Sequence, residues 1–435
     1  MSAGGPGRLS AGAIQALDDA LRPLDDWAAA RWPGGAGLGQ PIHTVYVPAD
    51  QAAPGLCSDW GRRARAALDE FGATAQELAS AVGLPAAEVQ DAWPLLLRAL
   101  EEQPIQDLRV DLEDGYGPHS DADEDAHADA AAQTLLAEAA DPAGPRRCGI
   151  RHRSLEASTR PRAVRTLDRV VGRLMQAGGL PSGFVVTLPK VIHLDQVRVY
   201  VVLLDALEQA HGLPSGALRF EIQVETPQTI LGPDGTLPLA PMIEAGAGRV
   251  TGLHYGTYDY SAAMGVGAQH QRADHPVAQT AKAVMRLAAA GTGVEVSDGS
   301  TNRLPVGDRG TVHANWAEHT RLVLGALSDG VRQGWDLHPA QLVTRHLTTI
   351  VVQRRGLPEK LDRLAAYLAA TGQGNAAAAP STSGGGALDE PATAQALAAD
   401  AMRAVESGAA QTSEVESRTG APSEALRALA NRRVV

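Results

Sequence analysis

The sequence predicts an α/β protein folded as a (β/α)8 TIM barrel, with a helical insertion after the first strand and a helical C-terminal tail. Eight short β-like runs alternate with stretches of helical pattern, and this alternation indicates a parallel sheet. Eight such units favour a closed barrel, although an open doubly wound sheet also fits. Polar residues gather at the carboxyl ends of the runs, where all barrel loops that can form an active site lie on one face.

The elements follow one another in a regular order. Residues 1–40 are expected to form an N-terminal helical segment, and residues 41–370 the barrel. The long connection at about 55–107 has the pattern of a small helical insertion. The expected strands are 44–50, 108–114, 148–154, 184–190, 219–226, 249–260, 293–299 and 334–339. The stretch "LDQVRVYVVLLDALEQAHG" is typical of the intervening helices, since Asp195 can cap its start and Gly212 its end.

The C-terminal part of the chain differs in composition. Residues 371–386, "TGQGNAAAAPSTSGGG", form a low-complexity sequence typical of a flexible linker. Residues 387–435 are expected to form a helical tail that opens at Asp389 with Pro391 in its first turn.

Composition limits the function classes. Of 435 residues, 44% are hydrophobic and 20% charged, enough for a sizeable core. The net charge of -12 without a basic run argues against nucleic-acid binding. The N-terminus lacks the pattern of a signal peptide, and no apolar run is long enough to span a membrane. Two cysteines, Cys57 and Cys148, suit a reducing compartment, so we expect a cytoplasmic protein without membrane partners.

Three carboxylates crowd the end of the second expected strand. Asp111, Glu113 and Asp114 arrive together, followed by two glycines, in "LRVDLEDGYG". Carboxylates this close repel and raise one another's pKa. Such crowding at the carboxyl end of a core strand indicates a site that holds compensating positive charge.

Two further carboxylates end neighbouring strands. Glu225 follows the fifth strand and Asp259 ends the sixth. Because adjacent barrel strands place their ends close together, the two side chains could share one cation. Oxygen ligands without Cys or His indicate Mg²⁺ or Mn²⁺. The alternative is that each is a solvated loop acid or a helix cap.

Three basic residues lie at strand ends. Arg151 could hold a substrate carboxylate or an enolate oxygen, or it could pair with the Asp111–Asp114 carboxylates, and both roles are compatible. Arg153 shares its strand face by period two, so which of the two points inward stays open. Lys190 could form a Schiff base with a carbonyl substrate, although a charge that balances nearby acids is the favoured interpretation.

Seven segments in order carry a family resemblance, over about residues 42 to 350. They are "HTVYVPADQ", "VDLEDG", "IRHRS", "LPKV", "IQVETPQTIL", "GLHYGTYDY" and "GWDLHPAQL". Their order and placement resemble the HpcH/HpaI aldolase, citrate lyase beta-subunit and malyl-CoA lyase superfamily. The resemblance implies a Mg²⁺-dependent barrel that makes or cleaves a carbon–carbon bond through an enolate, in a homo-oligomer such as a trimer or hexamer.

The same resemblance implies roles for individual residues. Glu225 and Asp259 would bind the metal ion, and Arg151 would contact the substrate. Glu113 and Asp114 would hold metal-bound waters or the catalytic water.

We therefore expect a Mg²⁺- or Mn²⁺-dependent carbon–carbon lyase or aldolase whose partner is a small-molecule carboxylate, a 2-oxo acid or an acyl-CoA thioester. Arg151, Glu113 and Asp114 are the expected catalytic residues, and Arg151, Arg153 and Lys190 the expected substrate-binding residues. One alternative is a metal-free Schiff-base aldolase that uses Lys190. The other is a non-catalytic barrel that serves as a binding or regulatory scaffold.

Overall fold

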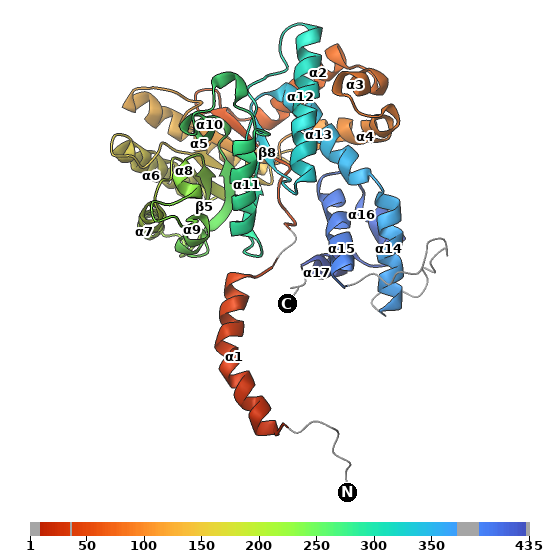
Figure 1. Cartoon of the computed structure of the whole chain (residues 1–435). Coiled ribbons are helices and arrows are strands. Elements are labelled where there is room, and N and C mark those ends of the chain that lie inside the picture. The colour runs from red at the N-terminus through yellow and green to blue at the C-terminus, as the bar shows by residue number, and fades with distance from the viewer. Residues whose placement is uncertain (1–8, 35–36, 372–390, 432–435) are drawn as a thin grey trace.

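Eight parallel strands form a barrel surrounded by helices (Figure 1). The computed structural model describes residues 9–34, 37–371 and 391–431. The strands are β1 (His43–Pro48), β2 (Asp107–Asp111), β3 (Arg147–Arg151), β4 (Phe184–Leu188), β5 (Arg219–Val224), β6 (Val250–Tyr255), β7 (Glu295–Ser297) and β8 (Gly334–Asp336). Each lies within or overlaps one of the eight expected strands, so the predicted (β/α)8 fold is confirmed.

The strand order closes the sheet on itself. The strands pair in the sequence β7-β6-β5-β4-β3-β2-β1-β8, so β8 lies beside β1. The remaining seam, between β7 and β8, is joined by a parallel bridge from Ser297 to Gln333. The backbone N–H of Asp298 also donates to the Gln333 carbonyl at 2.8 Å. The barrel is therefore nearly closed, and the carboxyl ends of its strands share one face.

Helices cover the outside of the barrel. They are α5 (Asp121–Ala140), α6 (Arg160–Gln176), α7 (Leu194–His211), α8 (Pro227–Ile230), α9 (Leu239–Ala245), α10 (Thr257–Ala263), η1 (Ala268–His270), α11 (Pro276–Ala289), α12 (Arg309–Ser328) and α13 (Pro339–Arg354). Aliphatic strand residues such as Leu108, Val110 and Ile222 are fully buried and belong to the hydrophobic core. None of the helices in the described part of the chain is both long and apolar enough to cross a membrane.

Helices also form in the insertion and in the N-terminal segment. The insertion consists of α2 (Leu56–Phe71), α3 (Ala75–Val82) and α4 (Ala86–Glu102), which pack on α12 and α13. Helix α1 (Ala11–Arg31) projects away from the barrel and has no buried residue (Figure 1).

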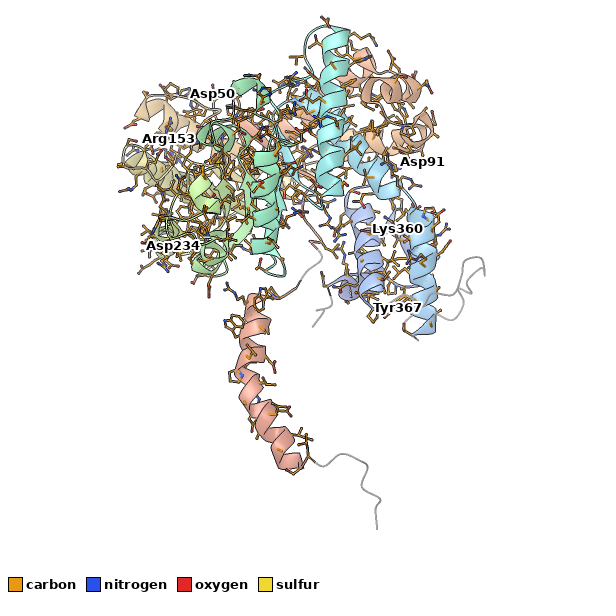
Figure 2. All side chains as sticks on the ribbon, viewed as in Figure 1. Asp50, Asp91, Arg153, Asp234, Lys360 and Tyr367 are labelled. Carbon is orange, nitrogen blue, oxygen red and sulfur yellow. The ribbon has the colours of Figure 1, made fainter. Side chains whose placement is uncertain are left out.

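The C-terminal helices pack against the end of the barrel domain. They are α14 (Leu357–Ala370), α15 (Pro391–Glu406), α16 (Thr412–Thr419) and α17 (Ser423–Ala430). The Lys360 ammonium of α14, marked in Figure 2, lies 3.1 Å from the Asp400 carboxylate of α15. Arg354 donates to the Ala409 carbonyl at 2.8 Å, and Met402 is buried. Apart from Thr371, the expected linker at 371–386 lies outside the described residues. The tail is therefore attached to the rest of the protein by ion pairs, hydrogen bonds and buried side chains, as well as by the linker.

The interior of the barrel is charged. The Arg109 guanidinium of β2 donates to the Glu221 carboxylate of β5 at 2.9 and 3.1 Å, and it also pairs with Asp107. These strands are three positions apart in the sheet, so the pair crosses the barrel. Burial would raise the pKa of Glu221, but Arg109 and His254 hold it lowered to about 2. Glu221 is therefore a buried carboxylate whose charge depends on Arg109.

We expect Arg109→Met to lower the free energy of unfolding by about 3–5 kcal/mol, because it leaves the Glu221 charge buried without its guanidinium. Arg198→Met is the matched control: Arg198 pairs with Asp195 on the surface, and its loss should change stability by less than about 1 kcal/mol. Urea denaturation followed by circular dichroism measures both. Equal, small effects would show that the pair across the barrel contributes little.

Candidate metal centre

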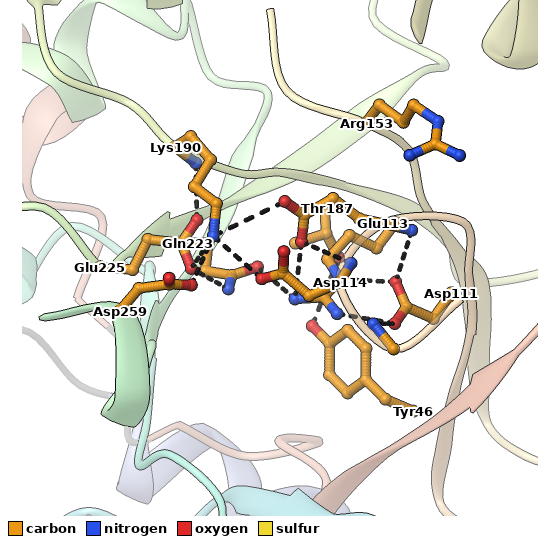
Figure 3. Close-up of polar contacts among 12 residues, drawn as sticks. Tyr46, Asp111, Glu113, Asp114, Arg153, Thr187, Lys190, Gln223, Glu225 and Asp259 are labelled. Carbon is orange, nitrogen blue, oxygen red and sulfur yellow. Dashed lines mark hydrogen bonds and ion pairs between the residues drawn. The ribbon is translucent and has the colours of Figure 1, made fainter. Parts of the chain in front are cut away.

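Most of the side chains that the sequence singled out meet at the carboxyl end of the barrel. Glu113 and Asp114 follow β2, Lys190 follows β4, and Glu225 follows β5. Asp259 reaches the same place from α10 (Figure 3). The parallel sheet brings together residues that lie far apart in sequence because it presents every strand's carboxyl end to one face.

Three carboxylates form a group that could hold a metal ion. Asp114, Glu225 and Asp259 each offer one oxygen, and these oxygens lie within 4.8 Å of one another. Oxygen donors of this kind suit hard divalent cations such as Mg²⁺ and Mn²⁺. The sequence predicted the pairing of Glu225 and Asp259 but gave Asp114 a different role. Asp114 could have been predicted as a ligand because it follows Glu113 directly in the acidic segment after β2.

The position of Asp259 corrects the expected strand 249–260. Strand β6 ends at Tyr255, and Asp259 lies in the first turn of α10 rather than on the strand. A Cβ atom at Gly256 would come within 2.5 Å of the Glu225 Cβ. The glycine therefore lets the chain turn from strand to helix directly against Glu225, and this turn delivers Asp259 to the group.

The Asp111 carboxylate fixes the loop that carries the acidic residues. It accepts two hydrogen bonds from the Arg151 guanidinium, both at 2.7 Å. It also accepts the backbone N–H groups of Glu113 at 3.0 Å and Gly115 at 2.9 Å. A Cβ at Gly115 would lie 2.6 Å from the Asp111 Oδ2, which explains why a glycine follows the three acids.

Arg151 connects this loop to the floor of the site. Its Nη1 lies 3.3 Å from the Glu113 Oε2 and donates to the Gln223 side-chain oxygen at 3.2 Å. Its guanidinium carbon lies 5.0 Å from the centre of the Tyr46 ring. Gln223 in turn donates to Glu225. Sequence reasoning missed Tyr46 and Gln223, although Gln223 precedes Glu225 by two residues on the same face of β5.

Lys190 extends into the carboxylate group. Its ammonium lies 2.9 Å from Asp114 and 3.6 Å from both Glu113 and Glu225, and it also pairs with Asp259. Its backbone has a positive φ of 53°, unusual for a residue with a side chain, and its N–H donates to the Glu225 Oε1 at 2.7 Å. Burial would lower the pKa of Lys190, but Glu225 and Glu113 raise it above its ordinary value. The amine is therefore held as an ammonium ion.

Burial and neighbouring carboxylates raise the pKa of two acids, whereas the nearby cations lower it. Glu225 is 1% exposed, and burial raises its pKa well above the ordinary value, with Glu113 and Asp259 adding to the effect of burial. Burial likewise raises the pKa of Glu113 to about 7, against the lowering effect of Arg151. An added cation would favour the charged form of both carboxylates.

Arg153 does not join these residues. Its Nε donates to the Glu124 carboxylate of α5 at 2.8 Å, and its Nη2 donates to the Gly117 carbonyl at 3.1 Å. Figure 3 shows its guanidinium pointing away from the carboxylate group. Strand β3 ends at Arg151, so the period-two argument for a shared face no longer applies two residues later. Of the two arginines, Arg151 points inward and Arg153 ties the β2–α5 loop to α5.

Comparison with known proteins gives one family match and several distant structural neighbours. The model of a family described as "Domain of unknown function (DUF6986)" matches residues 21–434. No curated protein sequence matches. A Haloferax volcanii malate synthase in a magnesium/glyoxylate complex is 15% identical with a TM-score of 0.48, covering 91% of this chain and 99% of its own. The same enzyme in a pyruvate/acetyl-CoA ternary complex is 15% identical with a TM-score of 0.46, covering 90% and 98%.

We expect Arg151→Lys to lower the free energy of unfolding by about 3 kcal/mol, because a lysine cannot replace both hydrogen bonds to the buried Asp111. Arg153→Lys should cost less than about 1 kcal/mol. In that variant Glu124 keeps its contacts with Arg162 at 3.1 Å and Thr166 at 2.8 Å. Chemical denaturation of both variants tests this difference, and an unchanged midpoint for Arg151→Lys would contradict it.

Proposed function

The chain belongs to the family described as a domain of unknown function (DUF6986), and we propose that it is a Mg²⁺-dependent carbon–carbon lyase or aldolase. Its substrate would be a 2-oxo acid or an acyl-CoA thioester. The observation that carries this proposal is the group formed by Asp114, Glu225 and Asp259 at the carboxyl end of the barrel. The ordered motifs, which resemble those of the HpcH/HpaI and citrate lyase beta-subunit superfamily, support the same chemistry.

The donor set fits the proposed ion. Three carboxylate oxygens from three different segments converge, and the described residues of the group include no sulfur or imidazole ligand. A divalent cation bound there would polarise a substrate carbonyl and favour the enolate that carbon–carbon bond cleavage requires. Asp114 and Asp259 are the more exposed ligands, whereas Glu225 is anchored by the backbone N–H of Lys190.

The remaining residues would position the substrate and move a proton. The Arg151 guanidinium is held rigidly by Asp111, so its Nη1 presents a fixed positive charge near Glu113. Glu113 lies between the two cations, 3.3 Å from Arg151 and 3.6 Å from Lys190. We assign Glu113 the proton transfer, directly or through a water, and Arg151 the stabilisation of negative charge on the substrate.

Lys190 would have a second position in the working enzyme. Its ammonium now contacts all three proposed ligands, so a bound cation and the ammonium would compete for the same carboxylates. A flexible four-carbon side chain lets the ammonium leave while its backbone N–H keeps hold of Glu225. Once displaced, Lys190 would be free to bind a substrate carboxylate at the rim.

The number of carboxylates at the site limits how much negative charge the substrate can carry. Five carboxylates, Asp111, Glu113, Asp114, Glu225 and Asp259, face the cations Arg151 and Lys190. This negative field repels polyanions until a divalent cation is bound. A compact substrate with one carboxylate beside its carbonyl group, as in a 2-oxo acid, fits this balance best.

We expect Glu225→Gln and Asp259→Asn each to weaken Mn²⁺ binding by about tenfold or more, because each removes a charged oxygen ligand. Isothermal titration with Mn²⁺ measures the affinity. Asp234→Asn, which removes an exposed carboxylate hydrogen-bonded to Thr236, is the control and should bind Mn²⁺ as the wild type does. Unchanged affinity in both site variants would remove the metal centre from the proposal.

Proton exchange tests the enolate chemistry without knowledge of the natural substrate. Pyruvate is the simplest 2-oxo acid with exchangeable methyl protons, and their loss into D2O can be followed by NMR. We expect exchange in the presence of Mg²⁺ and none after EDTA treatment or in Glu225→Gln. Exchange that survives EDTA would contradict a metal-dependent mechanism.

Reduction with borohydride tests the Lys190 alternative. A Schiff base requires a neutral amine, whereas the carboxylates around Lys190 keep it protonated. We expect mass spectrometry to find no reduced pyruvate adduct on Lys190 after borohydride treatment. An adduct on this residue would favour the metal-free aldolase instead.

A further inference from the structure

A cavity lies at the opposite end of the barrel from the carboxylate group. Its volume is about 460 Å³. Glu295 is the first residue of β7, and Arg332 precedes β8, so the cavity lies at the amino ends of the strands. Arg403 of α15 and Asn431 after α17 bring the C-terminal helices to the same cavity. It therefore occupies the junction between the barrel and the tail.

The lining of this cavity is basic in a chain that is acidic as a whole. Three arginines, Arg286, Arg332 and Arg403, line it together with one carboxylate, Glu295, whereas the chain carries a net charge of -12. Glu295 is already paired with Arg147, whose Nη2 lies 2.8 Å from its Oε1. Glu295 therefore does not neutralise Arg332, and Arg403 is paired with Asp400 of its own helix.

Arg332 is the residue that points to a ligand. Within the described ranges, no carboxylate or carbonyl oxygen lies in hydrogen-bond range of its guanidinium. Asp400 acts on Arg332 only at longer range and is engaged by Arg403 at 3.0 Å and by Lys360 at 3.1 Å. Burial and the neighbouring Arg403 lower the pKa of Arg332 to about 10. A half-buried guanidinium that shares a cavity with a second one is unfavourable unless an anion joins them.

We propose that this cavity binds a small oxyanion ligand, a molecule carrying a carboxylate or phosphate group, between Arg332 and Arg403. The planar guanidinium fork matches both groups and can hold two of their oxygens at once. The rest of the lining combines small residues such as Gly37, Gly291 and Gly293 with Gln40 and a few aliphatic side chains, and leaves room for a compact molecule. Because one arginine belongs to the barrel and the other to α15, the ligand would also strengthen the docking of the tail.

Thermal melts with added anions test this site independently of the metal centre. The full-length protein is melted in buffer containing EDTA, with inorganic phosphate or succinate titrated against chloride at constant ionic strength. We expect phosphate or succinate to raise the Tm of the wild type in a saturable way, because a ligand that binds only the folded state stabilises it. The stronger of the two responses identifies phosphate or carboxylate as the preferred group. The proposal would be overturned if neither phosphate nor succinate raised the Tm more than chloride does.

Arg332→Gln locates the effect. We expect this variant to fold with an unchanged or higher Tm, because it removes an unfavourable half-buried charge, and its apparent affinity for the anion to fall at least about tenfold. The control Arg198→Gln, at a surface pair on α7, should keep the full response. An equal response in wild type and Arg332→Gln would overturn the proposal. If Arg332→Gln does not fold, Arg332→Lys is tested instead. Weakened anion binding in this variant supports the proposal, because lysine lacks the guanidinium fork, and undiminished binding contradicts it.

Discussion

The pairing of Arg151 with Asp111 is the interaction on which the acidic end of the barrel depends. One carboxylate accepts the arginine from β3 and two backbone N–H groups from the loop that follows β2. The loop geometry, and with it the direction of Glu113 and Asp114, is set by that one carboxylate. Because the arginine is fully engaged, it adds positive charge to the site without the mobility of a free side chain. The crowding of acids at the strand end is therefore sustained by an internal cation.

Acidic side chains are also paired with arginine further down the barrel. The inward positions of β2 are Asp107, Arg109 and Asp111. Those of β5 are Glu221 and Gln223, and Glu225 follows directly after the strand. Residues on these two faces contact one another across the barrel or through Arg151. The aliphatic residues between them face the surrounding helices. The main hydrophobic core is thus a shell around the strands, while the barrel lumen contains hydrogen-bonded charges together with Tyr46, Trp335 and Thr187. Rigidity of the proposed metal centre comes from this packed polar column beneath it.

The sequence predicted the strands well and the directions of side chains less well. Each strand is a short aliphatic run ended by polar residues, a local pattern that survives in the fold. Side-chain direction at the strand ends depends on where each strand stops, which is a tertiary property. Arg153 shows this, because β3 ends two residues earlier than the alternation required. Asp259 shows it as well, because the turn at Gly256 is explained only by the proximity of Glu225.

Other features lay beyond local pattern altogether. Lys190 contacts carboxylates from three other segments and has a positive φ, which nothing in "TLPKV" indicates. The basic cavity gathers Arg332 and Arg403, 71 positions apart, from the barrel and the tail. The charged lumen, by contrast, left a signal: polar residues alternate along both "DLRVD" and "RFEIQV", which could have placed Arg109 opposite Glu221.

The charged lumen also restricts how this sequence can drift. An outward-facing Val110 or Ile222 can be exchanged for another aliphatic residue one step at a time, since the neighbouring helix surface accommodates small changes of shape. Arg109 and Glu221 have no such freedom, because the loss of either one leaves the charge of the other unpaired in the buried lumen. Viable replacements at these positions must arrive as compensating pairs. The inside of the barrel should therefore evolve in linked steps, while its outer wall evolves residue by residue.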